Sequence, residues 1–339
     1  ITLINTFLMG KIEDDLQGIF KALNESAYTM SQGGGIGCDF SSIRPRGIEI
    51  KGVERASSGP IPFMDMWDQM CQTILDGGIN RGAMMATLRC DHPDIEEFID
   101  SKKNNSRLTK FNISVLITNE FVTAAQTYSP WDLKFNGQII KTISASYLWN
   151  KIMETTYRYS EPGVLFIDLI NAKNKLSYCE EIIGTNSCGE QPLPYYGSAP
   201  LASINLAKLV KDPFTEKAEL NIEELEELVH IGIRFLDNIV TISKYPVIQQ
   251  KNEAENKRRI GLGITGLADA LAMCNIRYGS YESIKTVESW LSALRDSSYL
   301  ASAKLGKEKG SFPFFDKKKF INKLSELSLP DDIIFKVES

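Results

Sequence analysis

Short apolar segments alternate along the chain with longer segments in which apolar residues recur at helical spacing. Five of the short segments have the length and the β-branched content of buried strands. They cover residues 1–9, 84–90, 111–118, 163–170 and 201–207. Strands that alternate with helices are typical of an α/β fold with a largely buried sheet. The pattern therefore predicts the α/β class.

Three helices are predicted between these strands. The first follows Asp14 or Asp15, either of which can cap it, and its apolar residues recur every three or four positions. The second covers about residues 63–76, before a glycine pair that is typical of a helix stop. The third covers about residues 222–243. No repeat or linker divides the chain, so we treat residues 1–339 as a single domain.

Composition narrows the class of protein. The 339 residues are 43% hydrophobic and 24% charged, which is an ordinary balance for a globular protein. The formal net charge of -5 argues against a nucleic-acid partner, because nucleic-acid binders usually carry a basic face. No apolar run approaches the roughly 18 residues that a membrane span needs, and the start does not resemble a signal peptide. We therefore expect a cytoplasmic protein without a membrane partner.

One of the six cysteines has unusual neighbours. The six form no CxxC pair and have no histidine at zinc-site spacing, so we expect no metal site. Cys188 lies in TNSCGEQP, before a proline-containing segment that is typical of a loop, with Asn186 and Glu190 two positions away on either side. The trio suits a thiol that carries a hydrogen atom, beside a carboxylate that accepts a proton and an amide that holds the substrate. A cysteine that only fills the core is the alternative.

Two other enzyme classes are less well supported. A thiol hydrolase needs a histidine beside its cysteine. His92 is at the start of a predicted helix and His230 is within the third one, so a core or surface role is favoured for both. GLGITG, residues 261–266, matches the letters of a dinucleotide-binding motif, but the preceding NEAENKRR is not a strand pattern.

Glycine-rich and basic segments are candidate ligand loops. SQGGGIGCDF has glycines that let backbone N–H groups approach an anion or a sugar, although such a run is as often a simple turn. Arg44, Arg46 and Lys51 lie close together in sequence, and Arg81 lies among glycines. Clusters of this kind can hold a triphosphate. A solvated loop is the alternative for both.

A series of segments resembles the catalytic subunit of ribonucleotide reductases, closest to the adenosylcobalamin-dependent class. The resemblance covers nearly the whole chain, in order: GGGIGCDFSSIRPRG, ASSGPIPFMDMWD, GGINRGAMMATLRCDHPDIEEFI, KFNISVLITNEF, GVLFIDLINAKN, TNSCGEQPLPYYGS, ASINLAKLV and RRIGLGITGLADAL. It implies part of a ten-stranded α/β barrel with a central finger loop. It also implies that the later strands and the N-terminal ATP cone are missing from this chain.

The resemblance assigns a role to each candidate of the loop. It implies that Cys188 is the thiyl residue that abstracts the substrate 3′-hydrogen, that Glu190 is the base for the 3′-hydroxyl, and that Asn186 hydrogen-bonds the substrate. It further implies substrate contacts from the backbone of Gly34 and Gly35, with Asn5 near the phosphate side of the substrate.

The resemblance also implies regulation by a deoxynucleoside triphosphate. Asp14, Arg44, Lys51 and Arg81 are the effector-binding candidates, and residues 77–85 match the loop that relays effector identity to the substrate base.

The chain departs from the family at the redox pair. Thr6 and Ala199 occupy the two positions where the family usually has cysteines, and neither can form a disulfide. Ser187 replaces the proline that usually precedes the radical cysteine, a change that we expect to loosen the loop. A small-molecule reductant such as formate is one explanation. A catalytically degenerate paralogue that binds nucleotide or regulates another subunit is the alternative function.

The expected cofactor and partners follow from the same resemblance. Adenosylcobalamin is the expected radical generator, and a diiron or dimanganese partner subunit is the alternative. We expect a homodimer that binds a nucleotide substrate and a dNTP effector. A second polypeptide that completes the barrel is a further hypothesis, because half a barrel leaves an open sheet edge.

Overall fold

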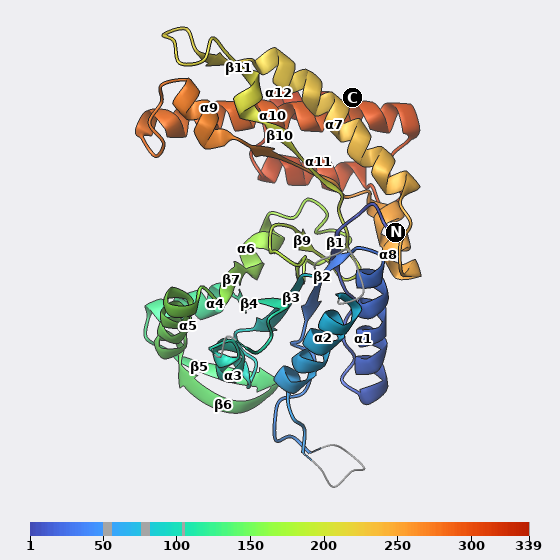
Figure 1. The fold of residues 1–339 in the computed structure, drawn as a ribbon, viewed down its shortest axis with the longest axis vertical. Coiled ribbons are helices and arrows are strands. Elements are labelled where there is room, and N and C mark those ends of the chain that lie inside the picture. The colour runs from blue at the N-terminus through green and yellow to red at the C-terminus, as the bar shows by residue number, and fades with distance from the viewer. Residues whose placement is uncertain (50–55, 76–81, 104–105, 339) are drawn as a thin grey trace. The chain divides into compact units, whose positions relative to one another are not determined.

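The computed structural model describes residues 1–49, 56–75, 82–103 and 106–338 (Figure 1). The chain divides into two compact units. The first contains Ile1–Ser198 with Lys244–Lys251, and the second contains Ala199–Ser243 with Asn252–Ser339. Each unit is described by itself.

The first unit is built on a five-stranded parallel sheet whose strand order, β1-β2-β3-β4-β7, follows the sequence. The strands are β1 (Thr6–Leu8), β2 (Gly35–Asp39), β3 (Met84–Arg89), β4 (Phe111–Ile117) and β7 (Gly163–Phe166). All four neighbouring pairs are parallel. The predicted α/β class with a parallel sheet is therefore confirmed.

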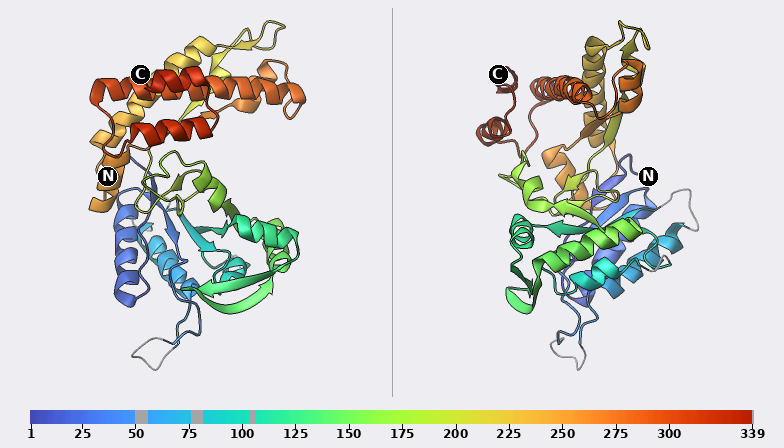
Figure 2. Two further views of the ribbon diagram at one scale, coloured as in Figure 1. Left: turned by 180° about the vertical axis from the view of Figure 1, so that it is seen from behind. Right: turned by 90° about the vertical axis from the view of Figure 1, so that its left-hand side faces the viewer.

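Helices α1 (Leu16–Ser31) and α2 (Pro60–Leu75) lie side by side against one face of this sheet (Figures 1 and 2). Asp15 caps α1, since its side chain accepts a hydrogen bond from the N–H of Gly18 at 2.7 Å. Trp67 of α2 is fully buried and donates through Nε1 to Ser26 of α1 at 3.0 Å. The predicted first and second helices are thus present, and their apolar sides form the core on this face.

A β-hairpin connects the later elements of the first unit. Its strands, β5 (Pro130–Phe135) and β6 (Gln138–Ser144), lie between α4 (Asn119–Gln126) and α5 (Ala145–Tyr159). Trp131 is buried and donates through Nε1 to the carbonyl of Cys90 at 3.0 Å. The hairpin is therefore fixed beside the carboxyl end of β3. The remaining helices of this unit are α3 (Ile95–Asp100) and α6 (Ile167–Ala172).

The opposite face of the sheet carries both apolar residues and the glycine and asparagine that face the Cys188 loop. Leu8, Gly37, Met85 and Asn112 are register partners across β1 to β4, so their side chains point to the same face. Residues one position along, such as Cys38 and Ala86, point toward the helices and are buried. A short antiparallel pair, β8 (Gly184–Thr185) and β9 (Pro192–Leu193), lies on the glycine-bearing face.

The second unit is mainly helical. Its parallel pair is β10 (Leu201–Asn205) with β13 (Gly261–Thr265), and its small antiparallel pair is β11 (Val210–Lys211) with β12 (Glu219–Leu220). The long helix α10 (Tyr281–Lys309) packs beside α7 (Ile222–Ile242) (Figure 2). The other elements are η1 (Leu206–Leu209), α8 (Ile248–Lys257, which contains the boundary between the units), α9 (Leu267–Met273), α11 (Lys317–Glu326) and α12 (Asp331–Glu338).

Two of the predicted strands are shorter in the structure than the sequence pattern indicated. The segment 163–170 is a strand only as far as Phe166, and α6 begins at Ile167. Asp168 in the first turn of α6 accepts a hydrogen bond from the N–H of Asn119, which holds the helix against the start of α4. The segment 1–9 pairs only over Thr6–Leu8. Within the described residues, none of the helices is long and apolar enough to cross a membrane.

Candidate active site

Cys188 lies in the loop between β8 and β9, as the sequence predicts. The loop closes through a hydrogen bond from the N–H of Asn186 to the carbonyl of Gln191 at 3.2 Å. The N–H of Gly189 donates to the carbonyl of Asn186 at 3.3 Å, and Gly189 has a positive φ of 87°. A residue with a side chain rarely adopts this φ, so glycine after the cysteine is required by the turn.

Asn186 organises the loop from its interior. Its side chain is buried, and its Nδ2 donates to Oε1 of Glu190 at 2.6 Å. Its Oδ1 accepts from the N–H of Gln191 at 3.0 Å. The carboxylate of Glu190 is therefore held by a buried amide within the loop that carries the cysteine, while Glu190 itself is exposed. The predicted trio is brought together in one loop.

Cys188 is an exposed thiol, in contrast with three buried cysteines of the first unit. Cys38, Cys71 and Cys90 are buried, and burial raises the pKa of the Cys38 and Cys90 thiols to about 12. A buried thiol of this kind is inert. Cys188 Sγ lies 3.7 Å from the hydroxyl of the buried Ser187, within range of a weak hydrogen bond.

Two glycines of β2 make room for the loop. A Cβ at Gly37 would lie 1.8 Å from the carbonyl oxygen of Thr185, and a Cβ at Gly35 would lie 2.7 Å from Oγ of Ser187. No side chain fits at either position without displacing the loop. The sequence suggested a ligand loop or a turn for the glycine-rich segment. Part of it is instead a strand, and the Cys188 loop packs directly against this strand.

The residues predicted to contact the substrate lie at or next to the start of β2, where the Cys188 loop packs. The N–H of Gly35 donates to the carbonyl of Asn5 at 2.8 Å, and the N–H of Gly34 donates to the carbonyl of Thr29 at 3.1 Å. Asn5 Oδ1 accepts from the hydroxyl of Thr6 at 3.0 Å. Both glycine N–H groups are therefore already bonded within the chain, and their contact with a substrate stays a prediction.

The two residues predicted to replace the redox pair, Thr6 and Ala199, are both buried. Thr6 is buried in β1 beside Gly35. Ala199 is also buried and directly follows Ser198, which forms a bridge with Phe7 of β1. A threonine and an alanine cannot form a disulfide, and their assignment to the redox-pair positions stays a prediction.

Two of the predicted effector residues bind each other. Arg44 donates through its backbone N–H and its Nε to the two carboxylate oxygens of Asp14, each at 2.9 Å, and through Nη2 to the Asp14 carbonyl at 2.7 Å. Arg46 instead pairs with Glu97 at 2.7 Å. Lys51, Arg81 and residues 77–80 lie outside the described residues.

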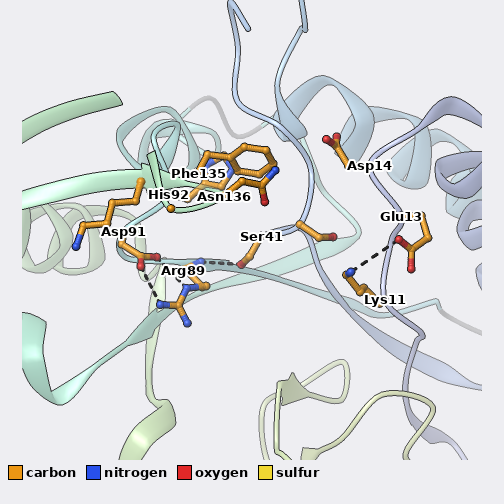
Figure 3. Close-up of a pocket in the computed structure, with 12 residues that line it drawn as sticks. Lys11, Glu13, Asp14, Ser41, Arg89, Asp91, His92, Phe135 and Asn136 are labelled. Carbon is orange, nitrogen blue, oxygen red and sulfur yellow. Dashed lines mark hydrogen bonds and ion pairs between the residues drawn. The ribbon is translucent and has the colours of Figure 1, made fainter. Parts of the chain in front are cut away.

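Asp14 also lines a pocket of about 520 Å³ at the carboxyl ends of β1, β2 and β3, closed on one side by the hairpin (Figure 3). Arg89 binds Asp91 through two hydrogen bonds of 2.8 Å, and the bond to Asp91 raises the pKa of Arg89. The sequence did not single out this pocket, because the hairpin joins the strands only in the folded chain. Its lining is Lys11, Glu13, Asp14, Ser41, Ser42, Arg89, Asp91, His92, Lys134, Phe135, Asn136 and Gly137.

Neither rival enzyme class gains support from the geometry. His92 is buried, its Nε2 bonds to the carbonyl of Ile43 at 2.9 Å, and its Nδ1 accepts from the N–H of Asp94 at 3.0 Å. Burial lowers the pKa of His92, so the ring is neutral and structural. In GLGITG the first two glycines are inside strand β13 rather than in a turn between a strand and a helix, so they do not form a dinucleotide-binding loop.

Comparison with known proteins places these features in a family. The family model described as ribonucleotide reductase, barrel domain, matches residues 4–330. The chain belongs to the ribonucleotide reductase family. The match runs through both compact units of the ribonucleotide reductase chain, including the Cys188 loop.

Several curated ribonucleotide reductases are similar to the chain. The vitamin B12-dependent ribonucleoside-diphosphate reductase of Thermoplasma acidophilum is 38% identical over 305 residues, which cover 89% of this chain and 39% of that protein. The protein of the same name from Mycobacterium tuberculosis (strain H37Rv) is 35% identical over 312 residues, covering 91% of this chain and 44% of that protein. The ribonucleoside-diphosphate reductase subunit alpha of Chlamydia pneumoniae is 26% identical over 94% of this chain and 33% of that protein. The chain thus spans less than half the length of these relatives.

Proposed function

We propose that the chain carries the radical site of a ribonucleotide reductase that converts ribonucleotides to 2′-deoxyribonucleotides. The observation that carries the proposal is the hydrogen bond from buried Asn186 to Glu190, which holds a carboxylate in the same loop as the exposed thiol of Cys188. A core cysteine would need neither an exposed thiol nor a carboxylate held in place. The names of the relatives support a ribonucleoside diphosphate as substrate.

Each residue of the trio has one task in this reaction. Cys188, as a thiyl radical, takes the 3′-hydrogen atom from the ribose and returns it at the end. Glu190 accepts the proton of the 3′-hydroxyl, and the 2′-hydroxyl leaves as water with a proton taken up from the solvent. Asn186 keeps the carboxylate oriented, and it would also hold the substrate. The two electrons for the reduction come from outside the trio.

We propose adenosylcobalamin as the radical generator, with a diiron or dimanganese partner subunit as the alternative. When bound, the cobalamin supplies the radical that removes the hydrogen atom from a thiol. The chain fits such a donor in one respect, because Cys188 is exposed on its loop. The names of the vitamin B12-dependent relatives also support this choice.

We propose a small-molecule reductant such as formate, because Thr6 and Ala199 cannot form the usual disulfide. Formate would be oxidised to carbon dioxide and would supply the two electrons that a dithiol otherwise gives. Product formed with formate but not with a dithiol supports this part of the proposal. The reverse result removes it.

We also propose a dNTP effector site at Asp14 and Arg44, with Lys51 and Arg81 as its further candidates, and a homodimer as the working state. A second polypeptide that completes the barrel stays a separate hypothesis. A compact and stable monomer of the purified chain, measured by sedimentation, would contradict both partner proposals.

The replacement Cys188→Ser tests the catalytic proposal. We expect complete loss of nucleotide reduction with nucleotide binding intact, because the hydroxyl has a much stronger bond to hydrogen than the thiol. The alternative function, a degenerate paralogue that only binds nucleotide or regulates, predicts no functional effect. Normal reduction by the serine variant would overturn the proposed function.

A further inference from the structure

One polar side chain from the sheet is bonded directly to the Cys188 loop. Asn112 of β4 donates through Nδ2 to the carbonyl of Ser187 at 2.9 Å. That carbonyl belongs to the peptide group that precedes Cys188. Among the described residues, this is the side-chain hydrogen bond that connects residues 185–191 with the parallel sheet.

The other contacts between the loop and this face are steric. Gly35 and Gly37 of β2 only leave space, and the methyl group of Met85 on β3 would lie 3.5 Å from a Cβ at Gly189. Met85 and Asn112 are register partners, so they come from adjacent strands to the same side of the loop. The steric contacts limit how closely the loop approaches the sheet, but they do not orient its peptide groups.

We propose that Asn112 is a positioning residue for Cys188. Its hydrogen bond fixes the direction of the peptide plane between Ser187 and Cys188, and the direction of that plane sets where the Cys188 side chain points. The loop needs such a bond, because Ser187, unlike a proline, leaves φ free at this position. This role rests on the proposed function only insofar as the thiol needs a fixed direction for hydrogen transfer.

Asn112 is well suited to a mutational test. It is an exposed residue, so its replacement empties no core space. Asn112→Ala removes the side-chain amide, and Asn112→Asp keeps the shape but has no N–H to donate. Asn119→Ala is the matched control, because Asn119 is an exposed asparagine at the first position of α4.

The measurement is hydrogen exchange of the 339-residue chain, followed by mass spectrometry on peptides that cover the loop. The N–H groups of Asn186, Gly189 and Gln191 are bonded within the loop, so they report its opening. We expect exchange in this segment to become about two- to tenfold faster in both Asn112 variants, which is the effect of losing one ordinary hydrogen bond. Exchange in the peptides of β3 and β4, and in the Asn119 control, should not change.

Three results would overturn the proposal. They are unchanged loop exchange in both variants, faster exchange spread through the whole sheet, or an aspartate variant that behaves like the wild type. In an actively reducing protein, Asn112→Ala should lower kcat with little change in KM, because the side chain contacts the loop and not the substrate; a raised KM with normal kcat would contradict this. Hydrogen exchange requires no turnover, so failure of the wild type to reduce nucleotide would count against the proposed function alone.

Discussion

At the scale of single residues, the chemistry depends on how Asn186 divides its bonds. One side of its amide fixes the loop backbone through Gln191, and the other holds Glu190. Sequence spacing indicated that Asn186, Cys188 and Glu190 belong to one site, because all three lie within five consecutive positions. It gave no indication that Asn186 and Glu190 bind each other, since this depends on the turn at Gly189.

The carboxylate of Glu190 can be tested without disturbing the fold. Glu190→Gln keeps the size and can still accept the bond from Asn186, but a neutral amide is a much poorer proton acceptor. Since Glu190 is exposed, the free energy of unfolding should stay within about 0.5 kcal/mol of the wild type. Turnover should fall by about 100-fold or more. Steady-state kinetics and urea unfolding provide the two measurements, and an active variant would exclude Glu190 as the base.

Asp39 at the end of β2 predicts a pH dependence of stability. Burial raises the pKa of this carboxyl from 3.8 to about 6, although Ser41 and Thr87 donate hydrogen bonds to it. A raised pKa means that the folded state favours protonated Asp39. The stabilisation that this protonation gives is fully present below pH 4, and it is lost as the pH rises through 6. The loss is on the order of 3 kcal/mol.

The variant Asp39→Asn removes this titration. The difference in the free energy of unfolding between the variant and the wild type should therefore shift in favour of the variant as the pH rises from 4 to 7. Urea unfolding of both proteins at several pH values measures the difference. A difference that stays constant with pH would show that Asp39 does not titrate in this range.

At the scale of elements, strand β2 supports the Cys188 loop, which its sequence pattern did not indicate. The glycines of residues 33–37 predicted a turn or a ligand loop, because glycine weakens a strand taken alone. In the structure Gly35 and Gly37 are part of β2, since the Cys188 loop occupies the space that their side chains would fill. The hairpin β5–β6 was likewise not anticipated from the pattern, and it forms one wall of the pocket near Asp14.

Replacement of Gly37 tests how closely the Cys188 loop packs against β2. In Gly37→Ala the new methyl group would meet the carbonyl oxygen of Thr185, so the loop or the strand must move. We expect a loss of about 1–3 kcal/mol in the free energy of unfolding, measured by urea titration, together with loss of activity. Gly306→Ala is the control, because nothing lies within 4 Å of its added Cβ and alanine favours a helix. Equal stability of the two variants would contradict the proposed fit.

At the scale of the whole molecule, the effector proposal concerns residues far from the radical loop in sequence. Asp14 follows β1 and Arg44 follows β2, and their mutual bonds leave both at the rim of the carboxyl ends of the sheet. Arg44, held in place by Asp14, would present its remaining N–H groups to a triphosphate bound here. Binding therefore does not require a complete radical site.

Calorimetry with the four deoxynucleoside triphosphates measures this site directly. We expect the wild type to bind them selectively, and Asp14→Ala to bind about tenfold more weakly or not at all, because the contact of Asp14 with the nucleotide and its hold on Arg44 are both lost. Cys188→Ser is the matched control, since it should bind like the wild type. Equal binding by Asp14→Ala would place the effector elsewhere.

Sequence patterns alone were sufficient for the α/β class, three of the helices, the loop position of Cys188 and the family. These depend on local periodicity and on residues close together in the chain. Three features became visible only in the folded chain. They are the packing of the Cys188 loop against β2, the hydrogen bond from Asn112 and the pocket near Asp14. Asn112 and Ser187 are 75 positions apart, and they form a hydrogen bond only because the Cys188 loop packs onto the sheet, a tertiary contact that no local pattern encodes.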